Sequence, residues 1–135
     1  MMTVSVGRTR DILERENYTV YVDILPGDGG FAGRKIYISH STPVLIPEPA
    51  HHHAGFDHVF ILVRGKAQLA TEQGARVEVV EMSPVFQYRV SGAVLHQLRL
   101  EPDSIVESLF DKQAWMNANI VVEHTLFPAT GGDPA

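Results

Sequence analysis

The chain has 135 residues, a net charge of -5 at pH 7, 44% hydrophobic and 20% charged residues, and no cysteine. This length suits one domain with a real core and is too short for two, so a duplicated two-barrel protein is excluded. The mixed charges, without a cluster of Lys and Arg, argue against a nucleic-acid-binding surface, and the lack of cysteine excludes disulfides, zinc–thiolate sites and thiol nucleophiles.

The start of the chain predicts neither a leader nor a membrane anchor. Residues 1–10 carry two arginines but no apolar segment, and no apolar run elsewhere is long enough to cross a bilayer. We therefore expect a soluble, cytoplasmic protein without a membrane partner. Residues 9–17 are polar, with Ile12 and Leu13 as their only large apolar pair, and we expect a short helix there.

The middle of the chain predicts many short strands. Runs rich in Val, Ile, Tyr and Phe alternate with turn-forming stretches such as Gly65-Lys66 and Glu101-Pro102-Asp103. This pattern is typical of an all-β sandwich or barrel and does not fit parallel βαβ units. The expected strands are 18–25, 35–39, 43–46, 59–64, 66–71, 76–80, 85–90, 96–100 and 104–110.

The end of the chain predicts a helix and a tail. Residues 111–118 contain Lys, Gln, Ala and Met without Gly or Pro, which favours a short C-terminal helix. Residues 128–135 are rich in Gly and Pro, and we expect them to be flexible. We therefore expect a single domain over residues 1–135, with the barrel core at about 18–110.

Three consecutive histidines, His51, His52 and His53, follow the rigid stretch Pro47-Glu48-Pro49. In an extended segment alternate side chains share a face, so His51 and His53 point the same way with their Cα atoms about 7 Å apart. His58 follows after a connection short enough for a hairpin turn, which would return it beside this pair. These imidazoles can then converge on one ion.

Residues 51–65 resemble the first cupin motif, which reads His, any residue, His, three or four residues, Glu or Gln, six residues, Gly. The spacing to Gly65 matches in full when His58 stands in the place of the usual carboxylate or amide. Asp57 is the alternative at this place, but it would leave seven residues before Gly65, so we prefer His58.

The second cupin motif is only partly present. Gly92 and His96 resemble its end with one extra residue between them, and Val90 stands where proline is usual. The value of this match is positional, because it puts His96 at the start of an alternating apolar strand, where the last ligand of the family belongs.

The resemblance implies a cupin double-stranded β-helix, or jelly-roll barrel, with one divalent ion held by His51, His53, His58 and His96. Imidazole ligands suit several ions, and Fe, Ni, Zn, Mn and Cu all remain open. The ligands must be neutral, so binding is expected to weaken as the pH falls through roughly 6 to 7. Four neutral imidazoles leave the double positive charge uncompensated, which favours an anionic oxygen ligand such as an enolate or a carboxylate.

The resemblance to cupins implies that the chain could be a dioxygenase, an isomerase or a lyase, since the family has members of these types. We expect a metal-dependent enzyme of one of these types acting on a small oxygen-bearing metabolite; the alternative is a non-catalytic cupin that binds a small ligand or a structural metal. Tyr88 shares a face with Phe86 and Val90, so its hydroxyl is a candidate catalytic acid, base or substrate anchor. The alternative is a core tyrosine with a hydrogen-bonded hydroxyl.

The strand at 59–64 is hydrophobic on both faces. Val59, Ile61 and Val63 alternate with the equally apolar Phe60 and Leu62. A strand of this kind needs cover on both sides, so we expect a homodimer. The alternative is cover by residues 3–6 or by the segment after residue 111 of the same chain.

Overall fold

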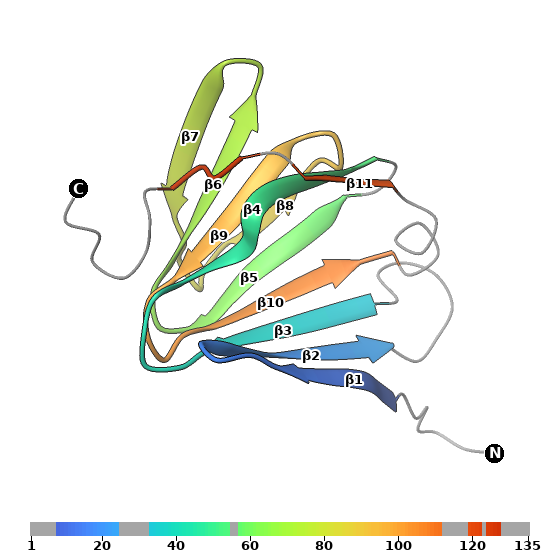
Figure 1. Ribbon diagram of the computed structural model, residues 1–135, viewed down its shortest axis with the longest axis vertical. Coiled ribbons are helices and arrows are strands. Elements are labelled where there is room, and N and C mark those ends of the chain that lie inside the picture. The colour runs from blue at the N-terminus through green and yellow to red at the C-terminus, as the bar shows by residue number, and fades with distance from the viewer. Residues whose placement is uncertain (1–7, 25–32, 55–56, 112–118, 123, 128–135) are drawn as a thin grey trace.

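The computed structural model describes residues 8–24, 33–54, 57–111, 119–122 and 124–127, and for residues 8–10, 24, 48–49, 53–54 and 119–122 it describes the backbone alone. These residues form strands and no helix (Figure 1). The strands are β1 Arg8–Glu14, β2 Tyr18–Ile24, β3 Gly33–Ser39, β4 Val44–Ala54, β5 His58–Arg64, β6 Ala67–Gln73, β7 Arg76–Glu81, β8 Gln87–Val90, β9 Leu95–Leu100, β10 Ile105–Phe110 and β11 Asn119–Val122.

The strands make two antiparallel sheets. One has the order β1-β2-β3-β10-β5-β8 and the other the order β11-β4-β9-β6-β7. From β3 onwards consecutive strands lie in different sheets, except for the hairpin of β6 and β7, so the chain passes back and forth between the two sheets as in a jelly roll. The all-β fold is therefore confirmed. In the part of the chain that is described, no helix is long and apolar enough to span a membrane.

All nine expected strands are confirmed, but the ends of the barrel differ from expectation. The helix expected at 9–17 is wrong, because this segment forms β1, in which Ile12 pairs with Tyr21 and Leu13 with Val20. Pairing along β2 satisfies the backbone of the segment, and this tertiary contact outweighs a weak local preference for helix. The helix expected at 111–118 falls on residues outside the described ones, apart from Asp111, which is not helical.

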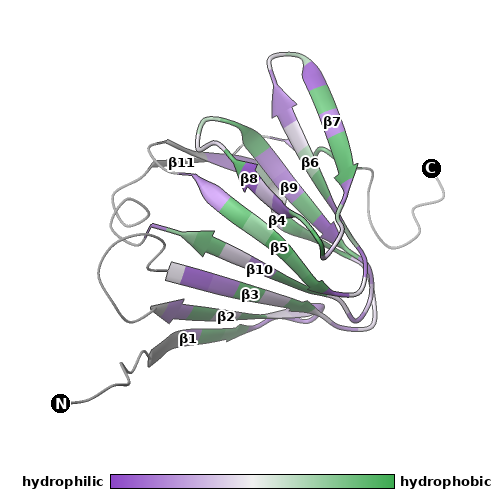
Figure 2. Ribbon diagram, turned by 180° about the vertical axis from the view of Figure 1, so that it is seen from behind, coloured by the Kyte–Doolittle hydropathy of each residue, from purple (hydrophilic) through white to green (hydrophobic). Residues whose placement is uncertain are grey.

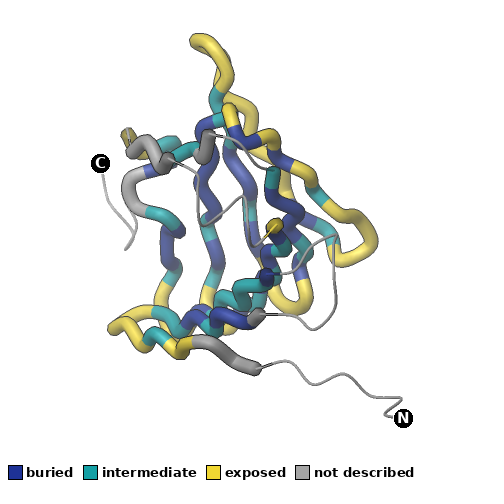
Figure 3. Tube along the Cα trace, turned by 90° about the vertical axis from the view of Figure 1, so that its right-hand side faces the viewer, coloured by how far each residue is buried: buried dark blue, intermediate teal, exposed yellow. Residues whose placement is uncertain are grey.

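The core lies between the two sheets. Leu98, Leu100, Val106 and Phe110 are at most 1% exposed. Val106 of β10 faces Tyr37 of β3 on one side and Leu62 of β5 on the other, so one row of inward side chains runs across the sheet. Figure 3 shows these buried strand centres, in contrast to the exposed β6–β7 hairpin at the top of the view.

The outer face of the five-stranded sheet is covered by residues 124–127. Phe127 and Leu126 pack against Leu45 and Ala70. Gln97 is fully buried beneath them; its amide nitrogen donates to the carbonyl of Pro47, and its amide oxygen accepts from the backbone N–H of Leu126, both at 2.8 Å. The bond to Pro47 ties β9 to β4, the strand that carries His51, and the bond from Leu126 ties the C-terminal segment to β9.

Candidate functional site

Three histidines meet where the two sheets face each other. His51 on β4 and His96 on β9 are direct partners in the five-stranded sheet, and their ring centroids are 5.2 Å apart. His58 comes from β5 in the other sheet, and its ring centroid lies 5.3 Å from that of His96. The jelly-roll crossing thus brings together side chains that no single sheet could place side by side.

The rings of His58 and His96 are buried and fixed in orientation. His58 is 5% and His96 is 2% exposed, and the ring of Phe60 stacks on His58 with an interplanar angle of 8°. Nδ1 of His96 lies 3.2 Å from the carbonyl oxygen of Val94, and Nδ1 of His58 lies 3.2 Å from Oγ of Ser108. A carbonyl only accepts, so the proton of His96 belongs on Nδ1 and its Nε2 carries the lone pair, as in a metal-ligating histidine.

The described residues bring three imidazole rings together, but these rings are not arranged to coordinate an ion. His53 stands two residues from His51 on β4, and its side chain is outside the described ones. Among the side chains that are described, no three His, Asp or Glu form a group that could hold an ion as they stand.

Asp57, the alternative to His58, belongs to a different interaction. Its Oδ2 accepts from Nη2 of Arg89 at 2.9 Å, and its Oδ1 accepts from the backbone N–H of Gly92 at 3.1 Å. The bond from Arg89, followed by that from Gly92, lowers the pKa of this carboxyl. His58, and not Asp57, lines the cavity.

Burial keeps His51 and His96 in their neutral form. Desolvation is the main cause that lowers the pKa of His51 and of His96 from 6.5 to about 4, and the charges of neighbouring histidines add to it. Neutral imidazoles are the form that a metal needs. Protons are therefore expected to compete with a metal near pH 4 to 5, which is lower than the range of 6 to 7 expected from unperturbed histidine.

These shifts predict that the metal-free protein loses stability in mild acid. Between pH 6.5 and about 4 the unfolded chain binds protons at His51 and His96 that the folded chain does not, so the contribution is complete above 6.5 and falls as the pH drops. The slope is up to about 1.4 kcal/mol per pH unit for each histidine. Urea unfolding at several pH values from 4 to 8 measures how the free energy of unfolding depends on pH. His96→Gln should flatten this dependence, whereas His124→Gln, at an exposed position, should not. Identical profiles for wild type and His96→Gln would contradict the assignment.

The cluster forms part of the wall of a cavity of about 430 Å³ inside the barrel. Its wall is largely apolar, with Ile46, Phe60 and Leu98 among the lining residues. The sequence did not single out four further residues that also line this cavity, Asp11, Tyr18, Lys35 and Tyr37. Burial, and then the neighbouring Tyr18, raises the pKa of Tyr37, so its phenol stays protonated and can donate a hydrogen bond. Alternation along β3 places Lys35 and Tyr37 on one face of the strand but does not say that this face points into the cavity.

Tyr88 is half-buried against the core and is not among the residues that line this cavity. Its hydroxyl oxygen accepts a hydrogen bond of 2.8 Å from the backbone N–H of Ser83. This arrangement corresponds to the structural alternative, in which the hydroxyl has a partner within the protein. The phenols at the cavity come from Tyr18 and Tyr37.

Comparison with known proteins identifies the fold. No protein-family model and no curated protein matches the sequence. CapF in complex with the inhibitor 3-isopropenyl-tropolone matches with a TM-score of 0.63 and 13% identity over 74% of this chain and 30% of CapF. A vicilin from Solanum melongena matches with a TM-score of 0.58 and 12% identity over 87% of this chain and 31% of the vicilin. A variant of Bacillus subtilis oxalate decarboxylase matches with a TM-score of 0.61 and 10% identity over 82% and 30%.

The matched proteins are cupin-fold proteins, so this chain has the cupin jelly-roll fold. It spans about a third of the length of each matched chain. At 10–13% identity the similarity concerns the fold, which carries many different functions. The matches include an enzyme and a vicilin, so the chemistry of this chain has to be argued from its own cavity.

Proposed function

We propose that this cupin-fold chain binds one divalent transition-metal ion, one of Fe, Ni, Zn, Mn or Cu, and acts on a small anionic, oxygen-bearing metabolite as a dioxygenase, isomerase or lyase. The ligands would be His51, His53, His58 and His96. The observation that carries the proposal is the convergence of His51, His58 and His96 from two sheets at one wall of the cavity. When bound, such an ion would polarise an oxygen of the ligand as a Lewis acid.

The residues of the chain provide the surroundings that such chemistry needs. Phe60 and Leu98 keep the histidine cluster dry, which strengthens electrostatic interactions inside the cavity. Tyr37 holds its proton and can donate to a ligand oxygen, and Tyr18 and Asp11 bring further groups that bear or accept protons. In this proposal Tyr37, Tyr18 and Asp11, and not Tyr88, are the candidate groups for proton transfer or substrate binding.

Proteins of the same fold support this class of ligand. One is named for oxalate, a second was crystallised with a tropolone inhibitor, and the vicilin from Solanum melongena is described with different anionic ligands in structurally similar pockets. Small, oxygen-rich or anionic molecules thus recur in these cupin-fold proteins. The same class of ligand suits a cavity with neutral imidazoles, phenols and one lysine.

A second candidate is a non-catalytic protein that binds a small ligand, or keeps a metal only for structure. A largely apolar cavity of about 430 Å³ with a few polar groups is also what a simple binding protein needs.

Elemental analysis after expression in metal-supplemented medium tests the proposal. We expect about one divalent ion per chain. With a β-dicarbonyl or enediol compound, the metal-loaded protein should then consume oxygen or turn the compound over. Binding of such a compound without any turnover, at full metal occupancy, would favour the second candidate. A protein that binds none of the five metals would contradict the metal site itself.

We also propose that the chain forms a homodimer through the outer face of its six-stranded sheet. Figure 2 shows that β5 is hydrophobic along most of its length. Phe60 and Leu62 are buried in the core, whereas Val63, on the outer face, is 54% exposed. Register places further apolar side chains on this outer face, namely Ile12, Tyr21, Ile36, Ile38, Val59, Ile61, Ile105 and Leu109. The same face also carries the ion pairs of Arg34 with Asp23 and with Glu107. The apolar side chains around them favour a partner on this face.

Light scattering tests the dimer. We expect twice the mass of the chain at micromolar concentration, and a monomer for Ile36→Lys or Val63→Lys, because a charge buried in the interface without a partner opposes association. Val85→Lys is the matched control, because Val85 is 80% exposed in a turn outside the sheet. A wild-type monomer, or an unchanged dimer in Ile36→Lys, would contradict this interface.

A further inference from the structure

Lys35 projects from β3 into the same cavity as the histidines. It pairs across the sheet with Ser108 of β10, and Ser108 pairs in turn with Phe60 of β5. Oγ of Ser108 lies 3.2 Å from Nδ1 of His58, so Lys35 stands beside the residue that orients one of the histidines. Both Lys35 and His51 line the cavity.

The distances agree with a shared binding space. Strands lie about 4.8 Å apart, so two strand spacings, about 10 Å, separate the backbones of β3 and β5. A lysine side chain covers much of that span. Lys35 and the three described histidines of the cluster line one cavity. One small ligand can therefore reach both Lys35 and the histidine cluster.

Asp11 lines the same cavity as Lys35, and apolar side chains lie beside the ammonium group of Lys35. Its Nζ lies 5.9 Å from the centroid of the Phe110 ring. Val22, its partner on β2, also lines the cavity. Burial lowers the pKa of Lys35 from its ordinary value because the apolar surroundings solvate the charge poorly. A carboxylate bound in the cavity would be attracted to the ammonium charge more strongly than in water.

We propose that Lys35 is the carboxylate-binding residue of this cavity, which makes the ligand a small carboxylic acid held between Lys35 and the histidine cluster. The apolar remainder of the acid would pack on Ile46 and Leu98, which line the same space. This inference rests on the proposed function and narrows its ligand from anionic oxygen compounds in general to carboxylates. The volume of about 430 Å³ limits the acid to a small one.

Calorimetric titration of the zinc-loaded and the metal-stripped protein tests the inference. The probes are 4-methyl-2-oxopentanoate and its neutral amide. Lys35→Met should weaken binding of the acid by about ten- to a hundredfold, which is the cost of losing a charged hydrogen bond, and change binding of the amide by less than about twofold. Metal content should stay as in the wild type. Lys35→Arg, which keeps the charge, should retain most of the affinity.

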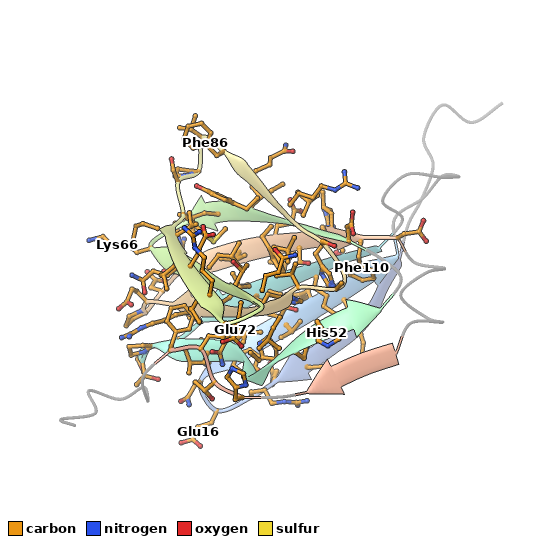
Figure 4. All side chains as sticks on the ribbon, turned by 90° about the horizontal axis from the view of Figure 1, so that it is seen from above. Glu16, His52, Lys66, Glu72, Phe86 and Phe110 are labelled. Carbon is orange, nitrogen blue, oxygen red and sulfur yellow. The ribbon has the colours of Figure 1, made fainter. Side chains whose placement is uncertain are left out.

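Lys66→Met is the matched control, because Lys66 is exposed and lies at the end of the molecule opposite Phe110 (Figure 4). If Lys35→Met does not fold, the NMR signal of the Lys35 Cε–Hε groups in the wild type should shift with the acid and not with the amide. Equal affinity of Lys35→Met and wild type for the acid, no binding of the acid by the wild type, or no shift of this signal would overturn the inference. A wild type that binds the acid through Lys35 without retaining zinc would instead contradict the metal proposal alone.

Discussion

Replacing His96 with alanine is expected to leave the protein nearly free of metal. His96 touches both other described histidines of the cluster, with ring centroids 5.2 Å from His51 and 5.3 Å from His58. Removing a residue that only hydrogen-bonds to a metal ligand and orients it already lowers metal affinity about 10- to 100-fold. Loss of the ligand itself should therefore cost at least about a hundredfold. Elemental analysis after metal-supplemented expression and dialysis measures the effect.

Matched variants separate this site from other histidines. His53→Ala should lower metal content as His96→Ala does. His52→Ala should not, because His52 alternates with its neighbours on β4 and does not line the cavity. His124, exposed and paired with Glu72 at 2.7 Å, offers a second control. Full occupancy in both His53→Ala and His96→Ala, with folding verified by circular dichroism, would show that the histidine cluster is not the metal site.

His58→Glu tests the departure from the usual cupin motif. A glutamate is the ligand type that the family uses at this place, so metal should be retained while the charge of the loaded site falls by one. Affinity for anionic ligands should then decline. Loss of metal in His58→Glu would indicate that the stacking of His58 on Phe60 and its contact with Ser108 allow only an imidazole there.

Gly65→Ala is expected to destabilise the fold by about 2–5 kcal/mol. The backbone of Gly65 has φ of 87°, which costs an L-residue about 1–2 kcal/mol. A methyl group there would also collide with the side chain of Ser104, which is fully buried and cannot yield freely. Ser104 accepts from the N–H of Lys66 at 3.0 Å and donates its own N–H to Oγ of Ser39 at 2.8 Å. Crowding of this kind adds about 1–3 kcal/mol.

Gly74→Ala is the matched control for this prediction. Gly74 also has a positive φ, 66°, but nothing lies within 4 Å of the position that a Cβ would take. For Gly74→Ala the free energy of unfolding should therefore fall only by the cost of the positive φ, about 1–2 kcal/mol. Urea or thermal unfolding of the two variants gives the difference, which measures the contact with Ser104. Equal destabilisation of both variants would contradict that contact.

The strand pattern of this chain could be predicted because it depends on local chemistry. The runs that became β2 to β10 are rich in β-branched and aromatic residues and are separated by turn residues, and each preference acts within a few positions. β1 was assigned to a helix instead. Its seven residues, with Ile12 and Leu13 as their large apolar side chains, form a strand because β2 lies beside them.

The faces of β3 show where pattern alone fails. Lys35, Ile36, Tyr37 and Ile38 alternate, and a hydrophobic pattern would turn the isoleucines towards the core. The structure places Lys35 and Tyr37 on the cavity side instead. The register with β10, in which Tyr37 faces the fully buried Val106, decides this orientation. The sequence pattern therefore did not reveal that Lys35 and Tyr37 line the cavity.

The sequence by itself determined that the chain folds as an all-β jelly roll, and it predicted His51, His53, His58 and His96 as the candidate site, because strand propensity and motif spacing are local properties. The tertiary structure alone decided that β4, β5 and β9 bring His51, His58 and His96 together, and that Asp57 turns to Arg89. It also decided that Lys35 and Tyr37 share the cavity, while the hydroxyl of Tyr88 bonds to Ser83. These outcomes depend on pairing between strands that are distant in sequence, since the side of a sheet that a residue faces is fixed by register and not by its own identity.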